Sequence, residues 1–203
     1  QLANGCGSGV LFSFAGGSGR MLVALPFFVI GSVLGSIILP PVLALGSLGQ
    51  FEIGASLSGF GKLAVNLALL LSAAAIFGWL GARRGFYLSQ KMLLATAMIA
   101  LLCWGVFWVS HHPWGVTFGF TLWGAKIASA IGVPMEEFTF WTWPGPQRAL
   151  THSVLSDTSS LMDFAMIIGA GLTAAVTGAF TKSAWPNASQ LKAAALRGLL
   201  MGI

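Results

Sequence analysis

The sequence predicts an all-α fold, a polytopic transmembrane helical bundle, and three observations lead to it. Hydrophobic residues make up 56% of the 203 residues, and the mean hydropathy is +0.86. Charged residues make up only 7%, against about 25% in ordinary soluble domains, which is too few to cover a soluble surface. The apolar residues also fall into long uncharged runs. Together these features exclude a soluble enzyme, a nucleic-acid-binding protein and a disordered regulator.

Four uncharged runs of 17 to 19 residues predict membrane-spanning helices, since about 20 apolar residues cross the hydrocarbon layer. These runs are residues 21–39, 63–80, 92–109 and 164–180. Pro40 and Pro41 follow the first run directly. We expect them to end that helix, because neither residue has a backbone N–H.

Three further segments are less regular. Residues 114–133 form a fifth candidate helix, which Lys126 interrupts, and a sixth begins near Ala193 and contains Arg197. The segment 134–160 mixes aromatic, acidic and proline residues, which predicts an interfacial or re-entrant segment. The chain begins without methionine and stops inside an apolar run. We therefore expect one integral-membrane domain over residues 1–203 that is a piece of a longer protein.

Basic residues indicate the orientation of the spans, and small residues indicate how they pack. Arg83, Arg84 and Lys91 lie in one short connection, which we expect on the cytoplasmic side, and Arg20 falls on the same side two spans earlier. Small residues four apart let helices approach closely in lipid. Such pairs are Gly31 with Gly35, Ser32 with Ser36, Gly115 with Gly119, and Gly171 with Ala175.

Residues 1–19 do not resemble a normal span. Asn4-Gly5-Cys6-Gly7-Ser8-Gly9 is a glycine-rich turn around a thiol, and a short apolar piece, residues 10–15, precedes a second glycine cluster at 16–19. Broken backbone at membrane depth is tolerated only inside protein or along a water-filled cavity, and it offers N–H groups to anions. We therefore expect a re-entrant loop that presents Cys6 to an anionic ligand. The alternative is a glycine-rich surface loop with an incidental cysteine.

Three charged residues have both a structural and a functional interpretation. Lys126 either extends to the headgroups or pairs with a carboxylate such as Asp157, or it attracts an anion into the path. Asp157 and Asp163 either cap the helix that follows or take part in a gate or proton-linked site.

The histidines do not form a recognisable metal or hydrolase motif. His111 and His112 lack further metal ligands nearby, and Ser153, beside His152, lacks a nucleophile-elbow motif. We predict no metal, no cofactor and no catalytic residue.

Several motifs in order along the chain are similar to those of one membrane-protein family. They are the Asn4–Gly9 motif, Leu122-Trp123-Gly124-Ala125-Lys126, the segment from Ser156 to Phe164 with Ile167-Ile168-Gly169-Ala170, and the terminal Arg197–Ile203 stretch. They resemble the YeeE/YedE family of inner-membrane proteins, whose characterised members take up thiosulfate. The second cysteine loop of that family, which would follow Ile203, is absent from this sequence.

The resemblance implies a pseudo-symmetric helical protein of the bacterial inner membrane with short re-entrant helices. In such a protein cysteines along a central path pass thiosulfate inward, and only Cys6 carries over as one of them. Cys103 lies in a plain apolar span, where cysteine packs as a small hydrophobic residue.

The leading hypothesis is therefore uptake of thiosulfate or a related sulfur anion, without enzymatic activity. We expect the Cys6 thiol to be neutral and shielded from water, because a thiolate would repel a dianion, and to contact the ligand as a weak S–H donor. The expected path residues are Cys6, Asn4, Gly5, Gly7 and Ser8, with Lys126 and Asp157 as weaker candidates. The expected partners are the sulfur anion, the lipid bilayer and a soluble sulfur-carrier protein.

Two alternatives remain open at the level of sequence. In the first, Cys6 carries a persulfide in a membrane-bound sulfurtransfer protein. In the second, the chain is a structural subunit whose glycines only pack helices.

Overall fold

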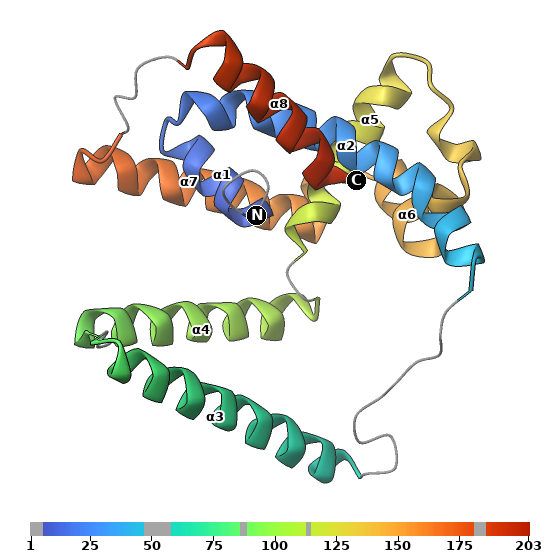
Figure 1. The fold of residues 1–203 in the computed structure, drawn as a ribbon. Helices are drawn as coiled ribbons and strands as arrows, with labels where there is room; N and C mark the ends of the chain where they lie inside the picture. Colours follow the sequence, from blue (N-terminus) through green and yellow to red (C-terminus); the bar gives the residue numbers. More distant parts are fainter. Residues whose placement is uncertain (1–5, 47–57, 86–88, 113–114, 181–185) are drawn as a thin grey trace. The chain divides into compact units, whose positions relative to one another are not determined.

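The computed structural model describes residues 6–46, 58–85, 89–112, 115–180 and 186–203. Over these residues it contains eight α-helices, three short 3₁₀ helices and no strand, which confirms the all-α prediction (Figure 1). The chain divides into two compact units, which are described separately. The first unit comprises the residues up to Leu45 together with Phe107–Ile203, and the second comprises Gly46–Val106.

Four of the helices in the described part of the chain are long and apolar enough to cross a membrane. They are α2 (Gly19–Ala44), α3 (Gly59–Arg83), α4 (Gln90–Ser110) and α7 (Thr158–Thr177). The runs 21–39, 63–80 and 92–109 lie inside α2, α3 and α4. Helix α7 begins six residues before the predicted 164, because Asp157 caps its N-terminus, and it ends at Thr177.

The prediction that Pro40 and Pro41 end the first long helix is wrong. Helix α2 continues through both prolines to Ala44 and also contains Pro26. The fixed φ of proline is compatible with a helix, so two prolines near its end remove two hydrogen bonds without breaking it. In membrane helices the freed carbonyls find other partners, which makes such prolines tolerable.

Two shorter helices correspond to the less regular predicted segments. Helix α5 (Val116–Ala130) lies within the predicted 114–133, but its 15 residues span only about 22 Å. Helix α8 (Ala188–Gly202) begins five residues before the predicted Ala193. A capping box explains this start, because Asn187 and Gln190 each accept a hydrogen bond from the other's backbone N–H.

Glycines let α2 and α8 lie side by side in the first unit (Figure 1). A Cβ atom at Gly31 would overlap the backbone of Leu199, and one at Gly198 would overlap the backbone of Ala24. The predicted small-residue pair of Gly31 and Gly35 thus forms a helix contact, with Gly202 opposite Gly35. The two helices pack backbone against backbone along this line, as close packing in lipid requires.

Two apolar clusters hold the remaining helices of this unit. Leu11 of α1 (Gly7–Ala15), Phe28 and Phe120 form one cluster, and the two phenylalanine rings pack edge to face at 4.9 Å. The other cluster is Val33, Leu122, Ala125, Met135 and Trp141. The segment 134–160 is therefore not a free linker. It contains the 3₁₀ helices Met135–Glu137, Thr139–Thr142 and Val154–Ser156, and α6 (Pro144–Thr151).

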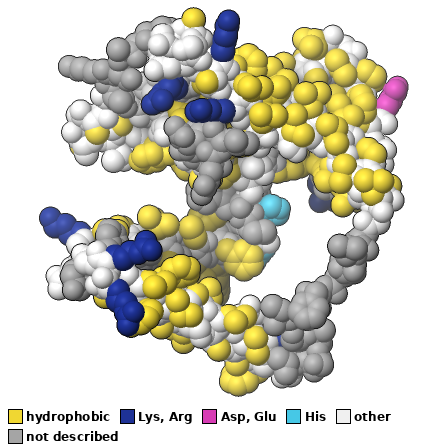
Figure 2. Space-filling model, viewed as in Figure 1, with side chains coloured by type: hydrophobic (Ala, Val, Ile, Leu, Met, Phe, Trp, Pro, Cys, Tyr) yellow, Lys and Arg dark blue, Asp and Glu magenta, His cyan; other side chains and the backbone are white. Residues whose placement is uncertain are grey.

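Helices α3 and α4 have a different surface. Neither helix has a buried residue, and large apolar side chains such as Leu71 and Leu94, each 69% exposed, extend along both. Hydrophobic side chains cover much of their visible surface (Figure 2). Such surfaces suit a lipid environment, where apolar side chains need no protein partner.

Candidate functional site

Cys6 is the N-cap residue of α1, with an extended backbone at φ −91° and ψ 175°. Gly7, Ser8 and Gly9 form the first turn of this helix, so the glycine-rich segment is helical from Gly7 onward, not a turn as expected. The Cys6 Sγ atom lies 3.0 Å from the Ser8 hydroxyl oxygen. Asn4 and Gly5, also expected in the path, lie outside the described residues.

Helix α1 is short, and it runs antiparallel to the first half of α2. Its nine residues span about 14 Å, and Gly17, at φ 86°, turns the chain back while the Ser18 amide donates to the Ser13 carbonyl. A Cβ atom at Gly7 would lie 3.5 Å from the Phe28 ring. The cysteine end of α1 is therefore beside the middle part of α2, well away from the ends of that helix.

The N-termini of three helices meet near this point. A Cβ atom at Gly7 would lie 3.6 Å from the Thr117 methyl group at the start of α5, and one at Gly115 would lie 3.9 Å from the Ser159 hydroxyl at the start of α7. Neither Cys6 nor Gly115 provides a side-chain cap for its helix. Helix N-termini carry partial positive charge and exposed N–H groups, so the starts of α1 and α5 favour an anion, whereas the Asp157 carboxylate already occupies the start of α7.

The environment of the Cys6 thiol differs from the expected one. The side chain is exposed instead of shielded, so burial does little to disfavour the thiolate. The Ser8 hydroxyl, and to a lesser extent the nearby Gly9 amide, hold the pKa of the Cys6 thiol below its usual value, because donor groups close to the sulfur stabilise the thiolate. The protein's own groups thus oppose the rise in pKa expected from a bound dianion.

Lys126 of α5 has carbonyl partners, not a carboxylate partner. Its ammonium group donates to the carbonyl of Leu150 at 2.8 Å and to that of His152 at 2.6 Å, both at the C-terminal end of α6. This arrangement suits the negative end of a helix. The expected pairing with Asp157 is not made within the described part of the chain, because the Asp157 carboxylate accepts from the Ser160 amide at 2.7 Å.

Asp157 and Asp163 have different roles. The capping predicted for Asp157 is confirmed, whereas Asp163 lies in the second turn of α7 and is fully buried, so its predicted capping role is wrong. Gly119 leaves room for the Asp163 carboxylate, because a Cβ atom there would overlap it. Beside it, the Trp123 indole donates to the Ser160 hydroxyl at 2.9 Å. A partly buried hydrogen bond therefore joins α5 to α7.

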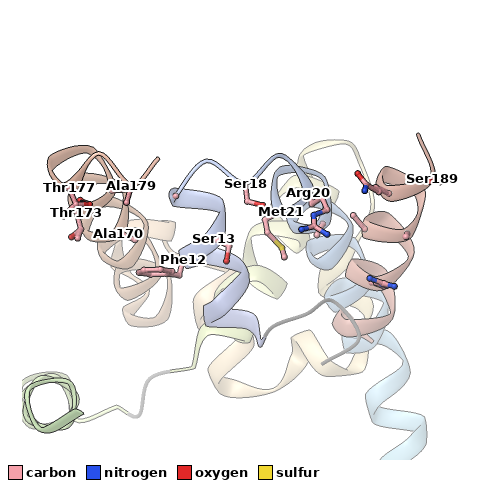
Figure 3. A pocket seen from close by; sticks show the side chains of 17 residues that line it. Phe12, Ser13, Ser18, Arg20, Met21, Ala170, Thr173, Thr177, Ala179 and Ser189 are labelled. Carbon is pink, nitrogen blue, oxygen red and sulfur yellow. The ribbon is translucent and has the colours of Figure 1, made fainter. Parts of the chain in front are cut away.

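A pocket of about 670 Å³ lies between α1, α2, α7 and α8 (Figure 3). Arg20 and Arg197 are the two charged residues among the described residues that line it, and Cys6 is not among them. The pocket instead contacts the second half of α1, through Phe12, Ser13 and Gly16. The anion-attracting features of this unit are therefore found in two places, at opposite ends of α1.

Comparison with known proteins gives a result that covers the whole chain. The sequence model of a family described as sulphur transport matches residues 1–203. The chain belongs to this family, the YeeE/YedE proteins. No curated protein sequence and no solved structure matches the chain. Membership in the sulphur transport family, together with the four apolar helices, identifies a membrane protein that transports sulfur compounds.

Sequence reasoning missed the arginine pocket of this sulphur transport protein. Arg20 was interpreted only as a marker of orientation, and Arg197 only as a charge inside the last apolar run. One signal was present, because an arginine inside an apolar helix faces the bundle interior or water far more often than lipid. The partner helix of Arg197, however, is encoded more than 150 residues earlier in the chain.

A second pocket, of about 660 Å³, brings His112, His152 and Asp157 together with Arg148. Near it, the Ser153 hydroxyl accepts from the Leu155 amide, and His152 Nδ1 lies 2.9 Å from the Arg148 carbonyl. Within the described ranges, no three His, Cys, Asp or Glu residues are grouped as metal ligands.

Proposed function

We propose that this chain forms part of a path for uptake of thiosulfate or a related sulfur anion across a bacterial inner membrane, as a multi-pass protein. One observation carries the proposal: the family's glycine–cysteine motif holds a thiol at the N-terminus of α1, beside the N-terminus of α5. Two uncapped helix N-termini provide N–H donors and positive potential for a dianion. Re-entrant helices in many transporters use the same arrangement.

In this proposal the Cys6 thiol contacts the terminal sulfur of thiosulfate as a weak S–H donor. A weak contact suits conduction, since an ion must leave each site that it reaches. Ser8 lowers the pKa of the Cys6 thiol, and a nearby dianion raises it by repelling the thiolate. Arrival of the anion therefore favours protonation of Cys6 and creates the donor that the contact needs.

The other proposed path residues act around this contact. Gly7 lets the start of α1 approach Phe28 and Thr117, Ser8 adjusts the thiol, and Asn4 and Gly5 precede it in the motif. Lys126 and Asp157 act indirectly in this proposal. Lys126 holds α6 against α5, and Asp157 fixes the N-terminus of α7.

Uptake of ³⁵S-labelled thiosulfate into proteoliposomes tests the proposal. We expect Cys6→Ala to lower the initial rate about tenfold, equivalent to about 1.4 kcal/mol of lost stabilisation, and the matched Cys103→Ala variant to transport normally. Because the S–H form is required, uptake should fall as pH rises through the pKa of Cys6. Ser8→Ala should move that fall to higher pH, since it removes the main cause of the lowered pKa. Full uptake by Cys6→Ala would reject the role of this thiol.

The exposed thiol with a lowered pKa also favours a second function, sulfur transfer. Here the Cys6 thiolate attacks the terminal sulfur of thiosulfate, the sulfur–sulfur bond of thiosulfate breaks, and sulfite leaves with the electron pair. The cysteine persulfide that remains would pass its sulfur to a soluble carrier protein. This reaction requires the thiolate, so its rate should rise with pH where uptake by the first mechanism falls. Mass spectrometry showing no persulfide on Cys6 during turnover would exclude it.

A further inference from the structure

The pocket that contains Arg20 and Arg197 has the character of an anion site. Both arginines line it, and no carboxylate occurs among the described residues around it. Figure 3 shows Arg20 at the start of α2 and Ser13 on α1, with Ser189 at the start of α8, among the residues that line the pocket. Ala24, Ala170 and Ala174 line its buried part. The lining therefore combines two positive charges with small side chains that leave room for a ligand.

Arg197 lies in the third turn of its helix, and its side chain is exposed. Helix α8 begins at Ala188, so Arg197 is about 14 Å along it, next to Gly198, which packs on the backbone of Ala24. Arg20 is one helical turn before Ala24 in α2. Both arginines therefore lie next to the point where Gly198 of α8 contacts the Ala24 backbone. A charged residue inside an apolar helix is costly unless it faces protein or water, and such residues mark ion pathways. Arg197 lines a cavity and meets this condition.

The hydrogen-bond donors of the lining are mainly those of the arginines. The hydroxyls of Thr173, Thr177 and Ser189 already donate to other oxygens, namely those of Gly169, Thr173 and Asn187. The Gln190 side-chain oxygen accepts from Asn187, which leaves its NH₂ group as a donor. Guanidinium groups bind tetrahedral oxyanions with paired, charge-assisted hydrogen bonds.

We propose that this pocket is a second anion site, separate from Cys6, that binds a free doubly charged oxyanion such as sulfate or thiosulfate. It recognises charge and the oxygen atoms that both anions share. Discrimination between them belongs to the thiol at the opposite end of α1, about 14 Å away along the helix. The identity of the physiological ligand rests on the proposed function, whereas the ability of the pocket to bind an anion does not.

Direct binding of ³⁵S-sulfate to the purified full chain tests the site. The starts of α1 and α5 also attract a dianion, so the binding assigned to this pocket is the part that the arginine variants lose. We expect Arg20→Gln and Arg197→Gln each to weaken binding about tenfold or more, as loss of a charge-assisted hydrogen bond does. Lys192→Gln removes a positive charge from the same helix outside the pocket and should bind like the parent. Cys6→Ala should also bind sulfate normally. Equal weakening by Lys192→Gln would overturn the site, because it would indicate a general charge effect.

A second measurement keeps both arginines, so it tests the site even if the glutamine variants do not fold. In a chain with Cys6→Ala, Cys103→Ala and Ala194→Cys, a negatively charged thiol reagent should react faster than a positively charged one, and sulfate should slow both. Arg197→Lys should fold and show intermediate affinity, since it keeps the charge and loses the planar fork. Unchanged sulfate binding in both glutamine variants, or no protection of position 194, would overturn the inference.

A phospholipid phosphate has similar chemistry, so binding is measured in nanodiscs of zwitterionic and of anionic lipid. Similar sulfate affinity in both supports a free anion, whereas loss of sulfate binding in anionic lipid overturns it in favour of a headgroup site. The two proposals also fail separately. If Cys6→Ala retains thiosulfate uptake, only the proposed function is rejected. If the arginine variants retain sulfate binding, only this second site is rejected.

Discussion

The first unit buries glycine, serine and aspartate residues between its helices, whereas α3 and α4 of the second unit bury none of their residues. In the first unit, backbone atoms of α2 and α8 touch where any side chain would collide. In the second, Gly78 and Gly105 have open space where a Cβ would stand. The long helices of both units have similar mean hydropathies, 2.5 and 1.6 for α2 and α7 against 2.1 and 2.2 for α3 and α4, yet the two units place different demands on their sequences. Helices α3 and α4 of the second unit need only an apolar run that is long enough to cross a membrane. The first unit also needs small or polar residues at the positions where its helices touch.

The largest expected difference in stability between the two units is the effect of replacing a glycine. Gly198→Leu should lower the free energy of unfolding by about 3 kcal/mol, because the new side chain meets the Ala24 backbone, which cannot move aside cheaply. Gly105→Leu in α4 should leave stability unchanged. Equilibrium unfolding in mixed detergent micelles measures both variants. Similar losses in the two would show that the contrast between the units is wrong.

The next largest expected difference in stability is the effect of replacing a lysine in each unit. Lys126→Met should cost about 1–2 kcal/mol, because two carbonyls at the end of α6 lose a charged donor. Lys91→Met, at the start of α4, serves as the control and should cost little, because its side chain is exposed. Thermal unfolding followed by tryptophan fluorescence measures the difference. A stable Lys126→Met variant would mean that α6 is held by its apolar contacts alone.

The smallest effect compares two helix caps. Asp157→Ala should cost about 1 kcal/mol, since the carboxylate accepts a 2.7 Å hydrogen bond at the half-buried start of α7. Ser58→Ala at the exposed start of α3, where the bond is 3.4 Å long, should cost only about 0.5 kcal/mol. The same unfolding measurement distinguishes them. Equal costs would indicate that burial does not strengthen the cap of α7.

Hydropathy was sufficient to predict the second unit and less so the first. The runs 63–80 and 92–109 lie within α3 and α4, because apolar composition and length alone determine a helix exposed to lipid. The end of α2 was missed, since proline chemistry sets only a local preference and the rest of the helix overrides it. The early starts of α7 and α8 depend on caps at Asp157 and Asn187, whose patterns were readable but were not used to place these boundaries.

The candidate site was only partly predictable for a related reason. The motif around Cys6 was recognisable because its residues are consecutive. The exposure of the thiol depends on α1 beginning at Gly7, which many glycines would ordinarily disfavour. The partners of Lys126 are backbone carbonyls, and every residue has one, so no side-chain pattern could identify them. The arginine pocket combines distant parts of the chain, and hydropathy carries no information about which helices meet.

The close contact between α2 and α8 has a mechanical consequence. Glycines on both helices let the two backbones touch. If one helix slid along the other, neighbouring side chains would move into positions where only the hydrogen of a glycine fits. We therefore expect α2 and α8 to move together as one body. We expect Arg20 and Arg197 to keep a constant spacing on this pair of helices, whereas α1 is joined to it only through the turn at Gly16 and Gly17 and through side-chain packing.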